Sequence, residues 1–587
     1  MLSVARPSIR PFLFSLFIFL ASAGSIFGQC GSLGANSTSW TDLAATQNFS
    51  TAGNWSNGAP TNALNTCIVN GTAGAPTTVS LTPGVNGSVL SLEVDANNTL
   101  NIGSGSDLFV SGPQIINGGA INFTAGAGNS VFQLEASTTL SGGGVLTLAT
   151  TGAGTALITG ASAGLTLTNQ GAIEGAGAIG GSAGFTVINQ GTILANVSGQ
   201  NLTIGGEVVD TTVNNSGGNM TGNSGGTIVL GAVDQFLEGT NTTVQGGTLN
   251  GTLATSAAGD AVVVLDGSTH GALTIASGAV YTNGNNSYLY TLGSIVNNGT
   301  INITSAGNNS ILGLNGNTTL SGTGVLNLST TVGGAALIVQ NSGGLTLTNQ
   351  STIAGYGSIG NGGGLAVNNQ GTINANVSGQ TLTLNGTGGV ANTALLEATN
   401  GGTLLISGAT VNNSGGNITG NGGTVELGGN GIIQGGTLNG TLSTIAGATG
   451  TLDGTTSGPI TISAGSTYTD SGTLLTKGTI TNNGNINVTA ATLELSTNTT
   501  LNGTGTVTLS GGTITGAAGG LTLTNGANST IQGAGTIGGS ANFTVMNQGT
   551  ILANVSGQNL AIGGEVVDTT VNNLGGNITG NGGGTVT

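Results

Sequence analysis

The sequence predicts an all-β fold, a right-handed parallel β-helix (β-solenoid) with rungs of about 20 residues and a small N-terminal cap. Three observations predict it: abundant glycine, scarce charge and long internal repeats. Glycine accounts for 115 of the 587 residues, whereas charged residues make up only 4%. Glycine among many Thr, Asn, Ser, Val, Leu and Ile residues favours short strands joined by tight turns. Because one globular core does not extend over such a length, we expect a one-dimensional stack.

Three long blocks recur, and each opens with Gly-Leu-Thr-Leu-Thr-Asn, at Gly164, Gly344 and Gly520. Each block then contains Ala-Asn-Val-Ser-Gly-Gln followed by Asn-Asn-x-Gly-Gly-Asn. The two motifs begin at Ala195 and Asn214 in the first block, at Ala375 and Asn412 in the second, and at Ala553 and Asn572 in the third. Their separation is 214 − 195 = 19 and 572 − 553 = 19 residues in the outer blocks but 412 − 375 = 37 in the middle one, a gain of 18. A solenoid tolerates such an insertion when it adds about one whole rung.

The finer period is seen in the turn-plus-strand signals at Asn169 and Asn189, which lie 189 − 169 = 20 residues apart. Alternation around Phe185 and Val187 predicts strands with one inward side. Equivalent residues would then stack, so repeated asparagines would form an amide ladder and glycines would supply corners with positive φ. Rungs of ~20 residues at ~4.8 Å each give on the order of 25 rungs and roughly 120 Å. The alternatives are a two-sided solenoid and a β-propeller, whose blades of about 40 to 50 residues do not match the insertion.

Residues 1–28 have the pattern of a secretory signal peptide. Arg6 and Arg10 form the basic start, Phe12–Leu20 the apolar core and Ala21–Ala23 the small-residue cleavage site. The core is shorter than the roughly 18 apolar residues of a membrane helix, and no later segment reaches that length. We therefore expect a secreted or cell-surface protein without a membrane-spanning segment in its mature chain.

Residues 29–75 differ from the rest and predict the cap. They contain both cysteines, Cys30 and Cys67, and both tryptophans, Trp40 and Trp55. Two cysteines in one short segment of an exported chain predict a disulfide around a cap that covers the first rung. The alternative is a lipid-modified Cys30, although the preceding residue is not the small one that this modification needs.

Residues 76–587 form the predicted β-helix, which we expect to be incomplete at its C-terminal end. Asn581–Thr587 is similar to Asn421–Glu426, where the second block continues into another coil. An uncapped last rung would expose a strand edge. We therefore expect an anchor or a translocator beyond Thr587.

The charge excludes several partners. The formal net charge is −16. Once Arg6 and Arg10 leave with the signal peptide, Lys477 is the only lysine or arginine, and His270 is the only histidine. Without a basic patch, nucleic acid and anionic lipid are poor partners. A hydrophobic content of 37% and a mean hydropathy of +0.27 also distinguish the chain from a disordered one.

Motifs that resemble catalytic or nucleotide-binding sites are better explained by composition. Glycine triads occur at Gly175, Gly177 and Gly180, at Gly355, Gly357 and Gly360, and at Gly533, Gly535 and Gly538. With this much glycine, such triads recur by chance on the order of 4 times, and no helix is predicted after them. Gly-x-Ser-x-Gly surrounds Ser162 and Ser182, but His270 is the only available base. We interpret all of them as turns.

Acidic residues are scattered, so the sequence predicts no enzyme, no cofactor and no metal site. The recurrent pair Glu207 and Asp210 reappears as Glu565 and Asp568, whereas the middle block has only Glu397 nearby. A hydrolase needs two suitably spaced carboxylates, and lyases of this fold use Arg or Lys as base, for which Lys477 alone remains. Minor alternatives are weak calcium binding by paired acids, ice binding through threonine faces such as Leu165–Thr168, and a small ligand at Tyr281, Tyr288 and Tyr290.

The chain resembles the β-helical passenger regions of bacterial surface proteins, namely autotransporters and filamentous-haemagglutinin-like adhesins. The resemblance rests on the export signal, on Asn54–Pro60 and Thr66–Gly71, and on repeated Asn-Gln-Gly-Thr-Ile, Asn-Asn-Gly-Thr-Ile and Asn-Asn-Gly-Asn-Ile strings. It implies a structural or adhesive role without catalysis, with a surface or matrix ligand that is a protein or a polysaccharide. The alternative is a β-helical carbohydrate-active enzyme or carbohydrate-binding protein.

Overall fold

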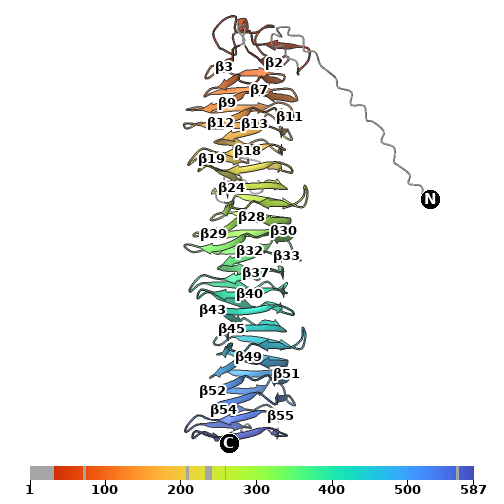
Figure 1. Cartoon of the computed structure of the whole chain (residues 1–587), viewed down its shortest axis with the longest axis vertical. Coiled ribbons are helices and arrows are strands. Elements are labelled where there is room, and N and C mark those ends of the chain that lie inside the picture. The colour runs from red at the N-terminus through yellow and green to blue at the C-terminus, as the bar shows by residue number, and fades with distance from the viewer. Residues whose placement is uncertain (1–31, 71–74, 206–209, 232–240, 258–259, 564–567) are drawn as a thin grey trace, which may run out of the picture.

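The computed structural model describes residues 32–70, 75–205, 210–231, 241–257, 260–563 and 568–587, which form one long rod (Figure 1). Its 60 strands belong to one sheet that winds around the rod axis. In the described part of the chain, the only helix is the 3-10 turn η1 (Ala52–Asn54). The stack has about 22 turns of ~24 residues. The predicted all-β parallel β-helix is confirmed, and at about 4.8 Å per rung it is roughly 105 Å long.

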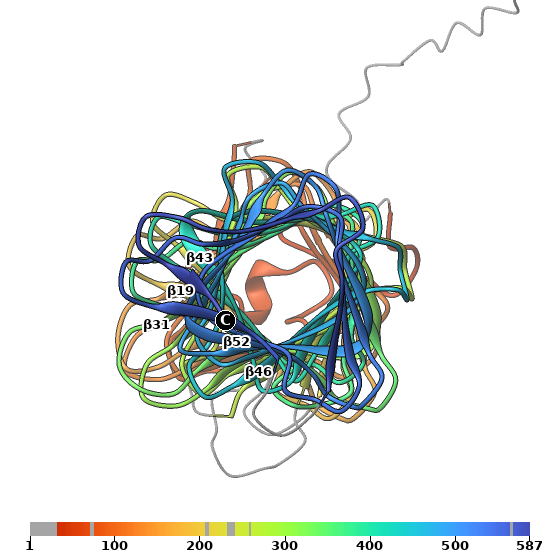
Figure 2. The same cartoon turned by 90° about the horizontal axis from the view of Figure 1, so that it is seen from below.

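Each regular rung has three strands, one for each face of the rod. One rung consists of β17 (Phe185–Asn189), β18 (Thr192–Ala195) and β19 (Asn201–Ile204), and the next of β20 (Thr211–Asn214), β21 (Asn219–Gly222) and β22 (Thr227–Leu230). β17 pairs in parallel with β20, β18 with β21 and β19 with β22. We call the columns that contain β17, β18 and β19 face 1, face 2 and face 3. Seen along the axis, loops leave the coil on several sides (Figure 2).

The rungs are longer than the predicted 20 residues. Asn169 pairs with Asn189, an offset of 20, but Val187 pairs with Val213 and Met220 with Leu249, offsets of 26 and 29. Loops at the corners lie outside the coil, so their length changes without affecting the strand register. The expected 25 rungs and 120 Å were therefore overestimates.

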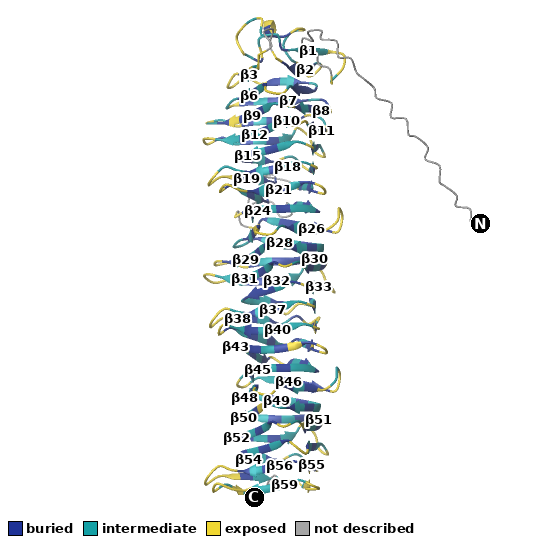
Figure 3. Ribbon diagram, in the orientation of Figure 1, coloured by how far each residue is buried: buried dark blue, intermediate teal, exposed yellow. Residues whose placement is uncertain are grey.

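The core is a set of stacked aliphatic columns. On face 2, Ile173, Ile193, Met220, Leu249 and Ile275 follow one another as ladder partners in successive rungs, and all are fully buried. Their neighbours in sequence point outward, which gives the alternation along the strands in Figure 3. Each rung therefore buries its apolar side chains against the rungs on both sides.

Asparagine ladders run along the core corners, as the repeats predict. The Nδ2 of Asn169 donates to Oδ1 of Asn189 (2.8 Å), and Nδ2 of Asn189 donates to Oδ1 of Asn215 (2.7 Å). Each amide also donates to a backbone carbonyl of the next rung, such as that of Thr192 (3.2 Å). Equivalent ladders join Asn349, Asn369, Asn392 and Asn413 in the second block and Asn525, Asn547 and Asn573 in the third. Within each ladder, the buried amides thus bond to the equivalent amides of neighbouring rungs.

The Asn-Asn-x-Gly-Gly-Asn motif is explained by this ladder. Its second asparagine, Asn215 in the first block, is the ladder member. The first glycine, Gly217, has φ +83. A Cβ on the second glycine, Gly218, would lie 2.5 Å from Nδ2 of Asn189 and 2.2 Å from its carbonyl oxygen. Only glycine lets the chain cross so close to the ladder.

The three blocks place their ladders on three different faces. The ladder strands are β14 (Thr166–Asn169), β17 and β20 on face 1, then β33 (Thr346–Asn349), β36 (Ala366–Asn369), β39 (Val390–Asn392) and β42 (Thr410–Asn412) on face 2, then β53 (Thr522–Asn525), β55 (Phe543–Asn547) and β58 (Thr569–Asn572) on face 3. The first ladder strand of the second block, β33, lies seven rungs beyond β14 and then one further face around the coil. From β33 the third follows after eight rungs plus one face. The 18-residue insertion therefore adds one rung and one ladder asparagine, and equivalent surfaces face three sides of the rod.

Aromatic residues close the core at the N-terminal end. β1 (Ser37–Ser39) pairs with β2 (Asn65–Ile68), which continues into face 1 through β5 (Leu92–Val94). Buried Trp40 and Trp55 meet edge to face at 5.0 Å, and Nε1 of Trp55 donates to the carbonyl of Phe49 (2.8 Å). Residues 1–28, the predicted signal peptide, and Cys30 lie outside the described residues, so the signal peptide and the disulfide from Cys30 to the buried Cys67 stay predictions.

Asp470 takes the place of a buried asparagine. Asn283, which ends β27 (Val280–Asn283), donates to Oγ of Ser310 (3.0 Å) and to the carbonyl of Ser287 (3.0 Å). Asp470 ends the corresponding strand β48 (Thr467–Asp470) and is also fully buried. Burial raises the pKa of Asp470 to about 6, although the N–H of Gly472 donates to its carboxylate (3.2 Å).

We expect Asn369→Ala to lower the free energy of unfolding by about 2–4 kcal/mol, because Asn349 and Asn392 each lose a buried amide partner. Asn368 is the matched control, since it lies next in sequence but is half-buried on the outer side. Urea denaturation of both variants measures the difference. Equal midpoints for Asn369→Ala and Asn368→Ala would contradict a structural role for the ladder.

We expect Asp470→Asn to stabilise the protein at pH 7 by about 1–2 kcal/mol. The folded-state pKa of Asp470 lies above its unfolded value, so its contribution to stability is present below pH 4 and is lost as the pH rises through about 6. Thermal denaturation between pH 4 and pH 8 should show a gain for the variant that grows with pH. A gain independent of pH would contradict the buried, titrating carboxyl.

Candidate functional site

A groove of about 710 Å³ crosses face 3 at the start of the first block, with part of its lining on residues that precede Gly164. Its floor is the outer surface of β13 (Ala156–Gly160), β16 (Gly177–Ile179) and β19, which belong to three successive rungs. Because the floor is a regular face of the sheet, the groove is a depression on the outside of the coil, bordered by corner loops.

The floor of the groove has an apolar strip and a shallow middle rung. Leu157, Ala178 and Thr203 are successive ladder partners whose side chains point outward. The middle rung contributes only small residues to the lining, among them Gly177 and Gly180. The hollow therefore forms where the middle rung lacks side-chain bulk.

The rims carry hydroxyl and amide groups. One rim is the loop of residues 151–155 after β12 (Val145–Thr150), where Oδ1 of Asn129 accepts from the N–H of Thr155 (2.8 Å). Oγ1 of Thr150 accepts from the N–H of Ala156 (3.2 Å). The other rim presents the exposed side chains of Gln200 and Asn201. The described residues of the lining include no charged side chain.

The glycine triad of the first block lies at this groove and precedes no helix. Gly175 ends β15 (Ala172–Gly175) with φ +112, and a Cβ there would lie 2.0 Å from the carbonyl oxygen of Leu148. It is a tight corner, as the composition predicts. The sequence does not predict the groove, because its depth depends on the loop of residues 151–155, which belongs to the preceding rung.

The other two blocks differ at the corresponding surface. In the middle block Tyr356 stands where the first block has Ala176, and its hydroxyl donates to the carbonyl of Thr330, the counterpart of Thr150. Oγ of Ser358 also donates to Oδ1 of Asn385 across the floor (2.9 Å). In the third block the rim loop is replaced by the continuous strand β52 (Thr506–Gly516).

The structure does not bring the serines together with the histidine. Ser182 precedes β17, and the exposed His270 follows β25 (Val262–Gly267), which lies three rungs further along face 1. That separation is roughly 14 Å along the axis. Ser162 lies in an exposed turn. No Ser–His pair results from these residues.

The predicted acidic pairs are only partly described. Glu207 and Glu565 lie outside the described residues. Oδ1 of Asp210 accepts from the N–H of Asn241 (2.8 Å), and Oε1 of Glu397 accepts from Nδ2 of Asn374 (2.7 Å). Burial raises the pKa of Glu397. Within the described ranges, no three His, Cys, Asp or Glu side chains gather as they would around a metal ion.

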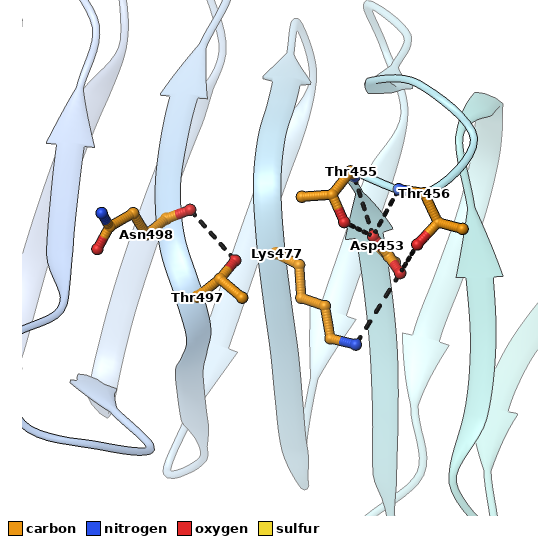
Figure 4. Close-up of polar contacts among 6 residues, drawn as sticks. All are labelled: Asp453, Thr455, Thr456, Lys477, Thr497 and Asn498. Carbon is orange, nitrogen blue, oxygen red and sulfur yellow. Dashed lines mark hydrogen bonds and ion pairs between the residues drawn. The ribbon is translucent and has the colours of Figure 1, made fainter.

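Asp453 anchors a turn through hydroxyl and amide donors (Figure 4). Its carboxylate accepts from the hydroxyls and N–H groups of Thr455 and Thr456, and Nζ of Lys477 lies 3.9 Å from its Oδ2. Although burial opposes it, this hydrogen bonding lowers the pKa of Asp453 to about 2. Asp266 binds Ser268 and Thr269 in the same way. Lys477 therefore adds an ion pair to a turn that forms elsewhere without one.

The three neighbouring tyrosines are not one surface group. Tyr281 is fully buried and its hydroxyl contacts Oγ1 of Thr255 (2.9 Å), so it is not part of a surface ligand site with the other two tyrosines, which was a minor alternative. Tyr288 and Tyr290, on β28 (Tyr288–Asn297), lie half-buried on the outer side with ring centroids 6.2 Å apart. The alternation of the strand separates the inward ring from the outward pair.

No known protein family and no curated protein sequence matches this chain. Among the described residues, no helix is long and apolar enough to cross a bilayer. The rod and the groove are therefore the two features of the molecule that bear on its function.

We expect Asp453→Ala to lower the free energy of unfolding by about 1–2 kcal/mol, because the hydroxyls and N–H groups of the exposed Thr455 and Thr456 lose their acceptor and water replaces only part of that bonding. Lys477→Ala should cost less than about 1 kcal/mol, since the Lys477 side chain is a third exposed and solvent screens the ion pair. Denaturation of the two variants compares them. A larger loss for Lys477→Ala would contradict the dominance of the hydroxyl and amide donors.

Proposed function

We propose that the protein is an extracellular or cell-surface stalk with a structural or adhesive role and without catalytic activity. The observation that carries this proposal is the single uninterrupted stack of parallel rungs. A stack about 105 Å long holds its surfaces away from its point of attachment. Reach and rigidity are properties that such a fold supplies directly.

The composition of the surface supports the same role. Outward positions carry mainly threonine, asparagine, serine and glycine, and charged residues are 4% of the chain. The three blocks turn related surfaces toward three sides of the rod. Broad, weakly charged faces suit shallow contacts with a surface or matrix ligand, either a protein or a polysaccharide.

The sequence supports export. Residues 1–28 carry the basic start, apolar core and small-residue cleavage site of a signal peptide. Secretion or surface exposure follows from this proposal, as does a disulfide between Cys30 and Cys67 in an oxidising compartment. The resemblance to autotransporter passengers and filamentous-haemagglutinin-like adhesins is part of the same proposal.

The groove on face 3 favours a second candidate, a carbohydrate-binding protein. Its described lining has hydroxyl and amide groups on both rims but no pair of carboxylates, which glycoside hydrolysis requires. This supports binding over hydrolysis. A β-helical carbohydrate-active enzyme is therefore the weaker alternative.

Display on a carrier cell tests the proposal. Residues 29–587 are attached to a non-adherent bacterial host through a heterologous surface anchor, and attachment to matrix-coated and abiotic surfaces is counted. We expect attachment several-fold above that of cells with the anchor alone. Attachment at the level of the anchor alone, or release of reducing or unsaturated sugar ends from polysaccharides by the purified protein, would contradict it.

A further inference from the structure

The groove on face 3 has the dimensions of a ligand site. Its volume of about 710 Å³ falls within the range of about 300–1,000 Å³ that is usual for small-molecule sites. The floor extends over three rungs, so β13 and β19 lie about 10 Å apart. An extended ligand of a few units fits this shape better than a compact one.

The lack of charged side chains in the described lining favours a neutral ligand. The chain as a whole has a net charge of −16, yet the described lining holds no Asp, Glu, Lys, Arg or His. Within the described part of the lining, an acidic ligand would find no cation and a basic ligand would find no carboxylate. Recognition must therefore come from hydrogen bonds and from apolar contact.

The hydrogen-bonding groups of the groove suit a ligand rich in hydroxyls. Thr155, Thr159 and Thr203 present hydroxyls that both donate and accept, and Gln200 and Asn201 present amides with both kinds of atom. Leu157 and Ala178 lie between them as an apolar strip. A sugar ring has the same two components, hydroxyls at its edge and C–H groups on its faces.

A peptide is a poorer fit, because extended peptides usually bind by adding a strand to a free sheet edge. Here β13 pairs with β10 (Ser130–Leu134) and β16, and β19 pairs with β16 and β22. Both sides of every floor strand are thus occupied. The groove offers side chains to a ligand, with no free backbone edge.

We propose that this groove binds a short segment of an uncharged glycan. The inference names a ligand class for the adhesive role proposed above, and its biological meaning rests on that role. The binding itself rests only on the groove. The site belongs to the first block, because Tyr356 and the Ser358–Asn385 hydrogen bond occupy the corresponding surface of the second, and the third lacks the rim loop.

The test uses purified residues 29–587 on a microarray of neutral oligosaccharides (hexose, pentose and N-acetylhexosamine types) and acidic ones (uronate, sialylated and sulfated types). We expect binding to one or more neutral glycans and none to acidic ones. Titration calorimetry with the best neutral glycan then measures the affinity of the variants. Binding to no neutral glycan, or a preference for acidic ones, would overturn the proposal.

Two variants act on the groove. Ala178→Tyr fills its floor from an outward position and should weaken binding at least tenfold. Gln200→Ala removes an exposed rim amide, with little risk to folding, and should weaken it at least threefold. The matched control is Thr536→Tyr, which makes the same ring at the equivalent outward position of the third block. Circular dichroism checks that each variant keeps its strand content.

Tyr290→Ala distinguishes binding in the groove from binding at the half-buried, outward tyrosine pair, Tyr288 and Tyr290. Affinities within twofold of the unmodified protein are expected for Thr536→Tyr and Tyr290→Ala. Unchanged binding in both groove variants, or loss in Tyr290→Ala, would place the glycan elsewhere and overturn the proposal. Cell attachment that persists with Ala178→Tyr, when the purified protein binds no neutral glycan, would reject the groove and leave the adhesive role standing.

Discussion

Parallel pairing of each strand with its equivalent one rung away is the constraint on which the rest of the structure depends. This pairing satisfies the backbone hydrogen bonds of the strands in interior rungs. It also stacks equivalent residues on one another, so that a favourable side-chain contact is repeated along the stack. Aliphatic side chains form continuous columns, and the asparagines of the corners bond to their own copies. A buried amide would otherwise need a different partner in each rung. The same constraint explains why loops can lengthen outward while the register holds.

The duplication of the blocks determines which face of the rod each copy occupies. Seven rungs plus one face separate the first two blocks, and eight rungs plus one face separate the second from the third. Whole rungs can be inserted without turning a block to another face, whereas the additional face distributes the three copies around the rod. The copies have diverged at the corner between two strands, where the first block has the buried Ala176 and the second has the half-buried Tyr356. Their ladders, which face the core, have kept asparagine.

Much of the fold was predictable from the sequence, because period, alternation and turn residues all arise from local chemistry. The asparagine ladder and the extra rung of the middle block were expected from Asn169, Asn189 and the 18-residue insertion. The rung length was underestimated because the clearest signal, the spacing from Asn169 to Asn189, comes from a rung with short corner loops. The inward position of Tyr281 was missed because it was grouped by proximity in sequence with Tyr288 and Tyr290. The groove could not be foreseen, since its floor and rims come from separate rungs.

The most direct test of this account is the shape of the molecule in solution. Small-angle X-ray scattering of purified residues 29–587, supported by electron microscopy of single particles, gives the maximum dimension and the cross-section. The account predicts an unbranched rod somewhat over 100 Å long with a constant cross-section. A compact globule, or beads joined by flexible linkers, would contradict the continuous stack and every functional inference drawn from it.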